Sequence, residues 1–223
     1  MKIKRVYDLT HPLFHNCPGW PDFDPPLVKR MLYQPRNICN VEWIEINTHT
    51  GTHIDAPYHF HADGKSMDQL PVETWLGEGI VADLSHLADR AFITAKELEK
   101  AAAHLRAGDI LMLYTGRGKD RGFNARYLKD WPGVDESGAR WLVERQVKMV
   151  GTDSLAIEAY GFPPEGKPIG HLTILGAGIP IIEEVFLEEI APFGQKRWQF
   201  ICLPLNLKAA GGSLARCLAI DEG

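Results

Sequence analysis

The sequence predicts an α/β fold in a single compact domain, because segments patterned like strands alternate with segments patterned like helices. A helical segment from Thr94 to Gly108 precedes an apolar, strand-like segment from Asp109 to Thr115. A second helix, from about Ser137 to Gln146, precedes a short strand from Lys148 to Gly151. The chain has 223 residues, of which 45% are hydrophobic, enough for one core. We therefore expect residues 1–223 to form one domain with a mixed β-sheet.

The elements before the first helix are predicted from alternation and from proline content. The segment Met1–Thr10 alternates charged and apolar residues and is predicted to be the first strand. Five prolines between Cys17 and Pro35 exclude a regular helix there and predict a loop. The segment Val41–Ile46 alternates and is rich in β-formers, so it is predicted to be a strand that runs straight into a cluster of histidines.

The helix after Thr94 has signals at both ends. Thr94-Ala-Lys-Glu97 has the form of a capping box, and Gly108 is suited to close the segment. Three apolar segments nearer the C-terminus predict further strands: His171–Ile182, which two glycines interrupt, Trp198–Leu203 and Leu214–Ile220. Hairpin-like and crossover connections occur together, which favours a mixed sheet.

The composition excludes several classes of partner. The net charge of -5 comes from acidic and basic residues mixed along the chain, so no basic block predicts binding to nucleic acid or to a membrane surface. No apolar segment reaches the roughly 20 residues of a membrane span, and the N-terminus lacks the apolar core of a secretory signal. The four cysteines show no Cys-x-x-Cys spacing, which argues against a disulfide framework and a thiolate metal site. We therefore expect a cytoplasmic protein.

Four of the nine histidines lie in one short window, His49–His61. An even distribution along the chain would place about 0.5 histidines in such a window. The window also contains Asp55, and a mixture of imidazoles with a carboxylate suits Zn²⁺ or Mn²⁺. The sequence therefore predicts a divalent metal site in this segment.

The spacing of the cluster predicts which side chains converge. In an extended chain His53 and Asp55 point to the same side, and His49 can join them if Gly51 lets the backbone turn. A helical alternative, with His49 and His53 one turn apart, is weakened by Gly51 and by the β-branched residues around it. We expect a strand and a turn that direct three ligands towards one ion.

His59 is predicted to move protons. Pro57 fixes the loop before it, and an imidazole can accept and return a proton near neutral pH. The sequence has no Gly-x-Ser-x-Gly motif, so metal-activated water is a better candidate for the attacking group than a serine. These residues predict a metal-dependent hydrolase of a small carbonyl compound, with His59 as general acid and base.

Aromatic residues near the cluster are candidates for the walls of a substrate pocket. They are chosen by position alone: Trp20, Phe23, Tyr58, Phe60 and Trp75. Burial in the core is the alternative for each of them. Two glycine-bearing segments are not predicted to bind phosphate, since Tyr114–Gly122 lacks the spacing of a dinucleotide loop and Gly211-Gly212 is interpreted as a turn or bulge.

The pattern His-x-Gly-Thr-His-x-Asp-x-x-x-His-Phe, from His49 to Phe60, resembles the signature of the metal-dependent cyclase family. That family includes bacterial kynurenine formamidases and isatin hydrolases. Weaker similarity covers nearly the whole chain, including Asp8–Leu13, Pro18–Pro21 and Gly151–Ser154, the last of which resembles a strand end that lines the pocket. The resemblance implies a domain of the swivelling β/β/α type that assembles as a homodimer or homotetramer.

The resemblance also implies the ligands and one or two divalent ions per chain. His49, His53 and Asp55 would hold one ion, Asp55 would bridge to a second, and two further residues would complete that second site: His171 and Glu183. His59 matches the catalytic histidine of the family. The family pattern usually continues from the glutamate with asparagine and leucine, whereas this chain has Glu184 and Val185. The alternative for Glu183 is the first-turn acid of a short helix, Glu183–Ile190.

By resemblance, the expected substrate is an arylformamide of the N-formylkynurenine type, whose C–N amide bond is hydrolysed. The first alternative is another enzyme on the same fold, either a hydrolase of a cyclic amide or lactone or a polyketide-type cyclase. The second alternative is a non-catalytic metal-binding module, for which a closed set of four ligands would be expected.

Overall fold

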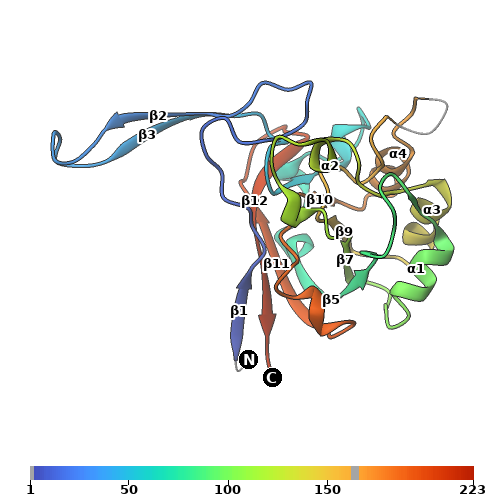
Figure 1. Ribbon diagram of the computed structural model, residues 1–223. Helices are drawn as coiled ribbons and strands as arrows, with labels where there is room; N and C mark the ends of the chain where they lie inside the picture. The colour runs from blue at the N-terminus through green and yellow to red at the C-terminus, as the bar shows by residue number, and fades with distance from the viewer. Residues whose placement is uncertain (1–2, 162–165) are drawn as a thin grey trace.

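The computed structural model describes residues 3–161 and 166–223. A mixed β-sheet that closes on itself lies at its centre (Figure 1). Around the closed part the strands follow the order β12 (Gly212–Asp221), β11 (Trp198–Pro204), β5 (Leu76–Asp83), β7 (Ile110–Tyr114), β9 (Met149–Thr152), β10 (Ile181–Glu183) and β4 (His53–Asp55). Pairing of β4 with the start of β12 completes the circle, and β1 (Arg5–Asp8) pairs with the end of β12. The prediction of a single compact α/β domain with a mixed sheet is confirmed.

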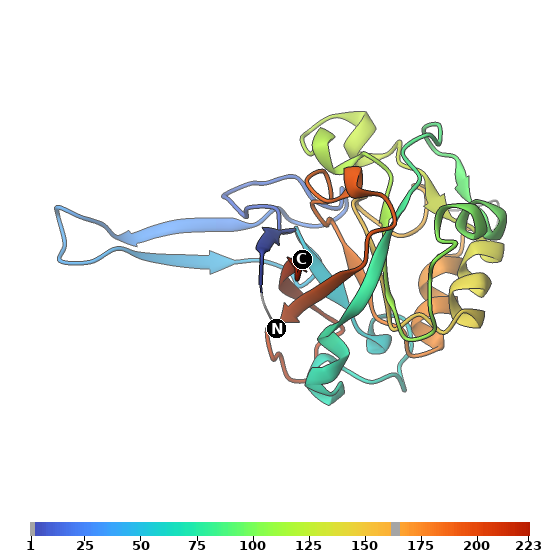
Figure 2. The ribbon, with the colours of Figure 1, turned by 90° about the horizontal axis from the view of Figure 1, so that it is seen from below.

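Helices cover one side of the parallel strands β5, β7 and β9 (Figure 2). They are α1 (Ala95–Ala101), α3 (Glu136–Glu144) and α4 (Ile169–Gly176), and α3 contacts both of the others. Buried aliphatic side chains such as Leu98, Leu113 and Leu142 form the core between helices and sheet. The opposite face of the same strands packs in a second core that contains Trp198 and Phe200.

Shorter elements join these layers. They are α2 (Ala125–Leu128), β6 (Phe92–Ile93), β8 (Gly133–Val134) and the 3-10 helices Pro57–His59, Met67–Gln69, Val72–Trp75, Gly118–Asp120 and Ala191–Phe193. Among residues 3–161 and 166–223, no helix combines the length and apolar character needed to cross a membrane.

Both helices predicted in the middle of the chain are present. Thr94 caps α1, where its side chain accepts a hydrogen bond from the backbone N–H of Glu97 at 3.3 Å. This helix ends at Ala101, earlier than predicted, and Gly108 instead serves the turn before β7, at a φ of 83°. Asp135 caps α3 in the same way.

A two-stranded arm projects from the body of the molecule (Figures 1 and 2). It consists of β2 (Leu27–Leu32) and β3 (Val41–Glu45), and every residue of β3 is exposed. The strand predicted at Val41–Ile46 is therefore real, but it does not run straight into the histidine cluster from the core sheet. The loop prediction for Cys17–Pro35 is wrong over β2, because the prolines leave residues 27–34 free to pair through their backbone N–H groups.

The predicted strand at His171–Ile182 is mostly wrong. Residues Ile169–Gly176 form α4, and only the end of the segment enters β10. A short apolar run fits a buried helix as well as a buried strand, and its glycines mark the end of the helix, where Gly178 has a φ of 79°. Glu183 lies in β10, so the alternative of a short helix from that residue is excluded.

Candidate metal centre

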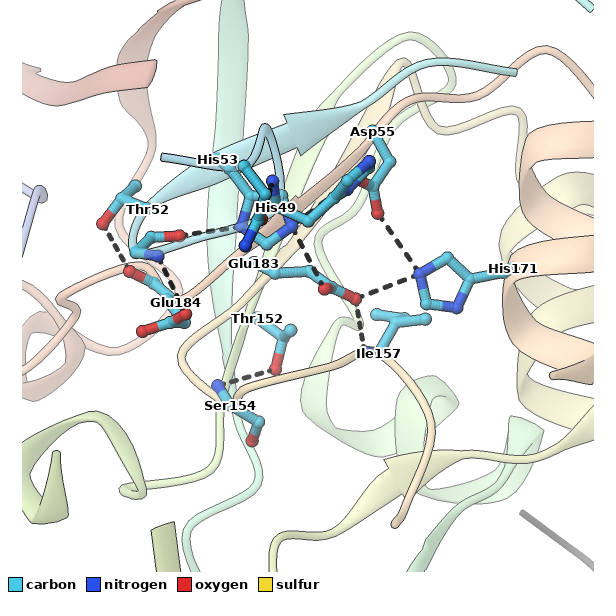
Figure 3. Close-up of polar contacts among 12 residues, drawn as sticks. His49, Thr52, His53, Asp55, Thr152, Ser154, Ile157, His171, Glu183 and Glu184 are labelled. Atoms are coloured by element: carbon cyan, nitrogen blue, oxygen red, sulfur yellow. Dashed lines mark hydrogen bonds and ion pairs between the residues drawn. The ribbon is translucent and has the colours of Figure 1, made fainter. Parts of the chain in front are cut away.

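Five side chains predicted as ligands lie together where β4, β10 and α4 meet (Figure 3). His53 and Asp55 belong to β4, Glu183 ends β10, His171 belongs to α4, and His49 precedes β4 in a loop. Strands β4 and β10 are antiparallel neighbours, with Glu183 opposite His53. The alternation predicted for β4 holds, since Ile54 points into the core while the residues on either side of it share the site.

Asp55 lies at the centre of the group and is fully buried. Its Oδ1 atom is 2.7 Å from Nδ1 of His49 and 3.5 Å from Nε2 of His53. Its Oδ2 atom is 3.2 Å from Nε2 of His171. The two carboxylate oxygens of Asp55 therefore face different imidazoles.

Glu183 closes the group from the side of β10. Its Oε1 atom is 3.2 Å from Nε2 of His171 and accepts a hydrogen bond from the backbone N–H of Ile157 at 2.7 Å. Its Oε2 atom is 3.5 Å from Nε2 of His53. The residues predicted for the first and the second ligand set thus form one continuous cluster.

Two of the imidazoles are oriented by a hydrogen bond from their other nitrogen. Nδ1 of His53 donates to the carbonyl of Gly51 at 2.7 Å, and Nδ1 of His171 donates to Oε2 of Glu158 at 2.6 Å. In each ring Nε2 is directed at the carboxylates, as in histidines that ligate metals. Glu158 also accepts the backbone N–H of His171. Sequence reasoning missed Glu158, because it lies in a loop with no spacing signal that links it to His171.

The ionisable groups of the cluster shift one another's pKa values strongly. Burial alone would raise the pKa of Asp55, but the adjacent imidazoles, His53 foremost, hold it well below its usual value. Burial alone would lower the pKa of His171, but Glu158 and Glu183 raise it well above its usual value. The imidazoles balance the buried carboxylates only while they carry protons. A divalent cation can replace those protons, so the donor set fits a metal ion.

His59 lies beside this group at the end of the 3-10 helix that Pro57 begins. Its ring stacks on that of His49, with centroids 3.9 Å apart. Burial lowers the pKa of His59 to about 4; the charge of Asp55 opposes this shift, and the neighbouring histidines reinforce it. A ring nitrogen of His59 also lies within 4.8 Å of donor atoms of His49 and Asp55, close enough to ligate an ion or to exchange protons beside one.

Gly211 and Gly212 make room for two of the histidines. Gly212 pairs with Asp55 across β12 and β4, and a Cβ atom there would overlap the imidazole of His49. A Cβ atom on Gly211 would lie 3.0 Å from Cα of His59. The interpretation of this pair as a turn or bulge missed that role, because the contact joins segments far apart in the sequence.

A cavity of about 350 Å³ opens onto the cluster. Its wall includes His49, His53, His59, His171 and Glu183, together with three of the predicted aromatic residues, Trp20, Phe23 and Phe60. Tyr58 is not part of the wall that the described residues form; it is 44% exposed, because the 3-10 helix turns it outwards while His59 turns in. Trp75 is buried in the core, which is the alternative given for it above.

The strand end Gly151–Ser154 does not line this cavity within the described residues, contrary to the expectation from resemblance. Asp153 is instead buried under the loop that follows β7, where it accepts hydrogen bonds from the backbone N–H groups of Thr115 and Gly116, each at 2.8 Å. The next residues along the chain, Leu155 and Ala156, reach the cavity.

Comparisons with known proteins agree with this geometry. The model of the family described as "Putative cyclase" matches residues 7–159. The kynurenine formamidase of Bacillus cereus is 31% identical to this chain, and the similarity covers 98% of each protein.

Two solved structures are similar over almost the whole chain. A potential metal-dependent hydrolase with cyclase activity has 29% identity and a TM-score of 0.79, with 98% of both chains covered. Isatin hydrolase A from Labrenzia aggregata, solved with benzyl benzoate bound, has 26% identity and a TM-score of 0.85, with 98% of this chain and 94% of that chain covered. The family match and the full-length similarity show that the chain belongs to the cyclase family.

Proposed function

We propose that this chain is a metal-dependent hydrolase of small aryl amides, with an arylformamide such as N-formylkynurenine as its substrate. One observation carries the proposal: four of the five proposed ligand side chains, His49, His53, His171 and Glu183, form part of the wall of an open cavity that also has aromatic walls. A binding site for a small aromatic compound needs both an apolar wall and a few convergent polar groups. The 31% identity to a kynurenine formamidase over the full chain supports the same substrate class.

In this proposal His49, His53 and Asp55 hold one divalent ion, and Asp55 with His171 and Glu183 holds a second. The support is that the two oxygens of Asp55 face different imidazoles, as a bridging carboxylate requires. Nitrogen and oxygen donors without sulfur suit Zn²⁺ or Mn²⁺. When bound, such an ion supplies a Lewis acid that polarises a carbonyl and lowers the pKa of water.

His59 is the proton carrier of the proposed reaction. With a pKa of about 4, its imidazole is neutral at neutral pH and can accept a proton from attacking water. It then returns the proton to the nitrogen of the leaving amine. Its ring lies in the wall of the cavity and is stacked on that of His49, so it faces both the substrate and the ligand cluster.

Trp20, Phe23 and Phe60 form the aromatic wall for the aryl group of the substrate. The ring of Phe60 stacks on that of His171, with centroids 4.7 Å apart, which places an apolar surface directly beside a proposed ligand. A cyclic aryl amide is the second candidate substrate, favoured by the similarity to isatin hydrolase A. A non-catalytic module is disfavoured, because its ion would need a closed set of ligands rather than an open cavity.

The decisive experiment assays the protein after metal removal and after reloading with Zn²⁺ or Mn²⁺, using N-formylkynurenine and isatin. We expect hydrolysis only in the reloaded protein, with the arylformamide preferred. The variant His59→Ala should keep its metal and lose turnover. Failure of the loaded protein to hydrolyse either compound would refute the aryl-amide proposal, and unchanged turnover of the variant would refute the role of His59.

Assembly as a homodimer or homotetramer and a location in the cytoplasm stay predictions. Light scattering of the purified protein would test the first, and fractionation of the source cells the second.

A further inference from the structure

Glu184, directly after the proposed ligand Glu183, contacts the turn between His49 and His53 (Figure 3). Its side chain is 1% exposed, and its Oε1 atom accepts a hydrogen bond from the backbone N–H of Gly51 at 3.1 Å. Its carbonyl oxygen accepts a hydrogen bond from the hydroxyl of Thr52 at 2.5 Å. A single residue therefore holds two successive residues of the turn.

The carboxylate of Glu184 is held in turn by two side chains from a separate part of the chain. Nε of Arg121 donates to its Oε2 atom at 3.2 Å, and the hydroxyl of Tyr127 donates to the same oxygen. The side chain of Arg121 is 8% exposed, so this ion pair is shielded from solvent. Burial and the adjacent Glu184 raise the pKa of Tyr127 well above its usual value, which keeps its hydroxyl protonated as a donor.

The backbone at Glu184 is unusual for this residue type. Its φ is 53°, in the left-handed region that asparagine and glycine enter more readily than glutamate. The usual asparagine of the family pattern would suit this backbone. Glutamate at this position is therefore stabilised by its contacts and not by its own conformational preference, which points to a role for the carboxylate.

The contacts lead from Glu184 to a proposed metal ligand. The carbonyl of Gly51 accepts the Nδ1–H of His53 at 2.7 Å, and this bond leaves Nε2 of His53 directed at Asp55 and Glu183. Gly51 has a φ of 65°, and a glycine backbone can adopt many conformations. The direction of its carbonyl group therefore depends on the contacts that hold the turn. We infer that Glu184, held by Arg121 and Tyr127, is a positioning residue that fixes the Gly51 turn and through it the tautomer of His53. The inference rests on the proposed metal centre.

The test measures the metal and the imidazole separately in Glu184→Ala, Glu184→Gln and Tyr127→Phe. Zn²⁺ affinity is measured by competition with a chromophoric chelator. The His53 tautomer is measured by ¹⁵N chemical shifts of the imidazole in metal-free protein at an alkaline pH at which the imidazole is neutral. Removal of a group that orients a ligand typically weakens metal binding by about 10- to 100-fold. We expect a loss of this size in Glu184→Ala, with a mixture of His53 tautomers. Smaller losses are expected in Glu184→Gln, whose amide oxygen can still accept from Gly51, and in Tyr127→Phe.

Asp109→Asn is the matched control. Asp109 is also a buried carboxylate paired with an arginine, Arg197 at 2.6 Å, but it lies at the opposite end of β7 from the cluster. This variant should lose stability and keep both the Zn²⁺ affinity and the His53 tautomer of the unmodified protein. Should Glu184→Ala fail to fold, the two conservative variants still decide the question.

The outcomes separate this inference from the proposed function. An unchanged His53 tautomer in all folded Glu184 and Tyr127 variants would overturn the positioning role, whether or not metal binds. Absence of Zn²⁺ and Mn²⁺ binding by the unmodified protein would overturn the proposed function, while the tautomer measurement would still decide the role of Glu184.

Discussion

Two fully buried aspartates, Asp55 and Asp153, are surrounded by different kinds of donor. Asp153 faces backbone N–H groups of the loop after β7 and the hydroxyl of Thr115, all of which are fixed by the fold. Asp55 faces three imidazoles, whose charge depends on protons that can leave. Burial leaves the pKa of Asp153 raised despite its hydrogen bonds, whereas the imidazoles hold that of Asp55 well below its usual value. A buried carboxylate that accepts hydrogen bonds from fixed backbone groups stabilises the fold. A buried carboxylate surrounded by imidazoles can bind a cation when those imidazoles lose their protons.

The largest effect is expected from Asp55→Asn. Loss of the shared carboxylate removes a ligand from both proposed ion positions, and metal stabilisation of several kcal/mol corresponds to a decrease in kcat/KM of about 10³-fold. Metal content by elemental analysis should fall with it, while circular dichroism should show an intact fold. Full metal content with normal turnover would break the distinction between the two aspartates.

Asp153→Ala should act on stability instead. It leaves several buried N–H groups of the loop without an acceptor, which we expect to lower the free energy of unfolding by about 3 kcal/mol. Denaturant unfolding measures this loss, and the Zn²⁺ affinity of the folded protein should not change. Weakened metal binding at unchanged stability would contradict the assignment of Asp153 to the fold.

His11 extends the comparison to a third buried group. Burial, reinforced by the adjacent Arg121, lowers the pKa of His11 to about 4, so in the unfolded chain it takes up a proton at a higher pH than in the folded chain. Stability that is present above pH 6.5 is therefore lost as the pH falls towards 4, by about 1 to 2 kcal/mol at pH 5. His11→Phe should reduce the slope of unfolding free energy against pH between 4 and 6.5. An unchanged slope would exclude His11 as its source.

The smallest effects are expected at two glycines. Gly212 is paired with Asp55 and packs against His49, and Gly118 packs against Asp153. Gly212→Ala should displace His49 and weaken Zn²⁺ binding by about tenfold. In Gly118→Ala the new Cβ would lie 3.3 Å from Cβ of Asp153, so stability should fall by about 1 kcal/mol with no change in affinity. Calorimetric titration measures the Zn²⁺ affinity of each variant, and thermal unfolding measures its stability. Equal losses of Zn²⁺ affinity in the two variants would contradict the distinction between Asp55 and Asp153.

The sequence predicts most of the metal cluster because three proposed ligands and His59 lie within one short segment. There, strand alternation and a single glycine determine which side chains converge. Glu158 and Glu184 could not be predicted, since they act through contacts with His171 and Gly51 across the fold. Gly212 was missed for the same reason. Local sequence patterns predict which side chains of one segment converge. The residues that orient those side chains come from distant segments, which only the topology of the fold brings close.

The sequence also predicts several elements of the fold, but not how all of them are placed. Capping by Thr94 predicted the start of α1, and apolar runs predicted the strands β7, β11 and β12. The position of β3 was not predictable, because an alternating strand looks the same in a half-buried sheet and in an exposed arm. The helix containing His171 was mistaken for a strand because its apolar sequence has no polar face to reveal a helical period.

The closure of β4 against the first residues of β12 has a consequence for biosynthesis. The proposed ligands on β4 leave the ribosome long before the neighbouring strand that carries Gly212, because β12 follows β4 far along the chain. A nascent chain can therefore expose His49, His53 and Asp55 long before it can enclose them. We therefore expect the proposed site to bind its ion only after translation has passed residue 214.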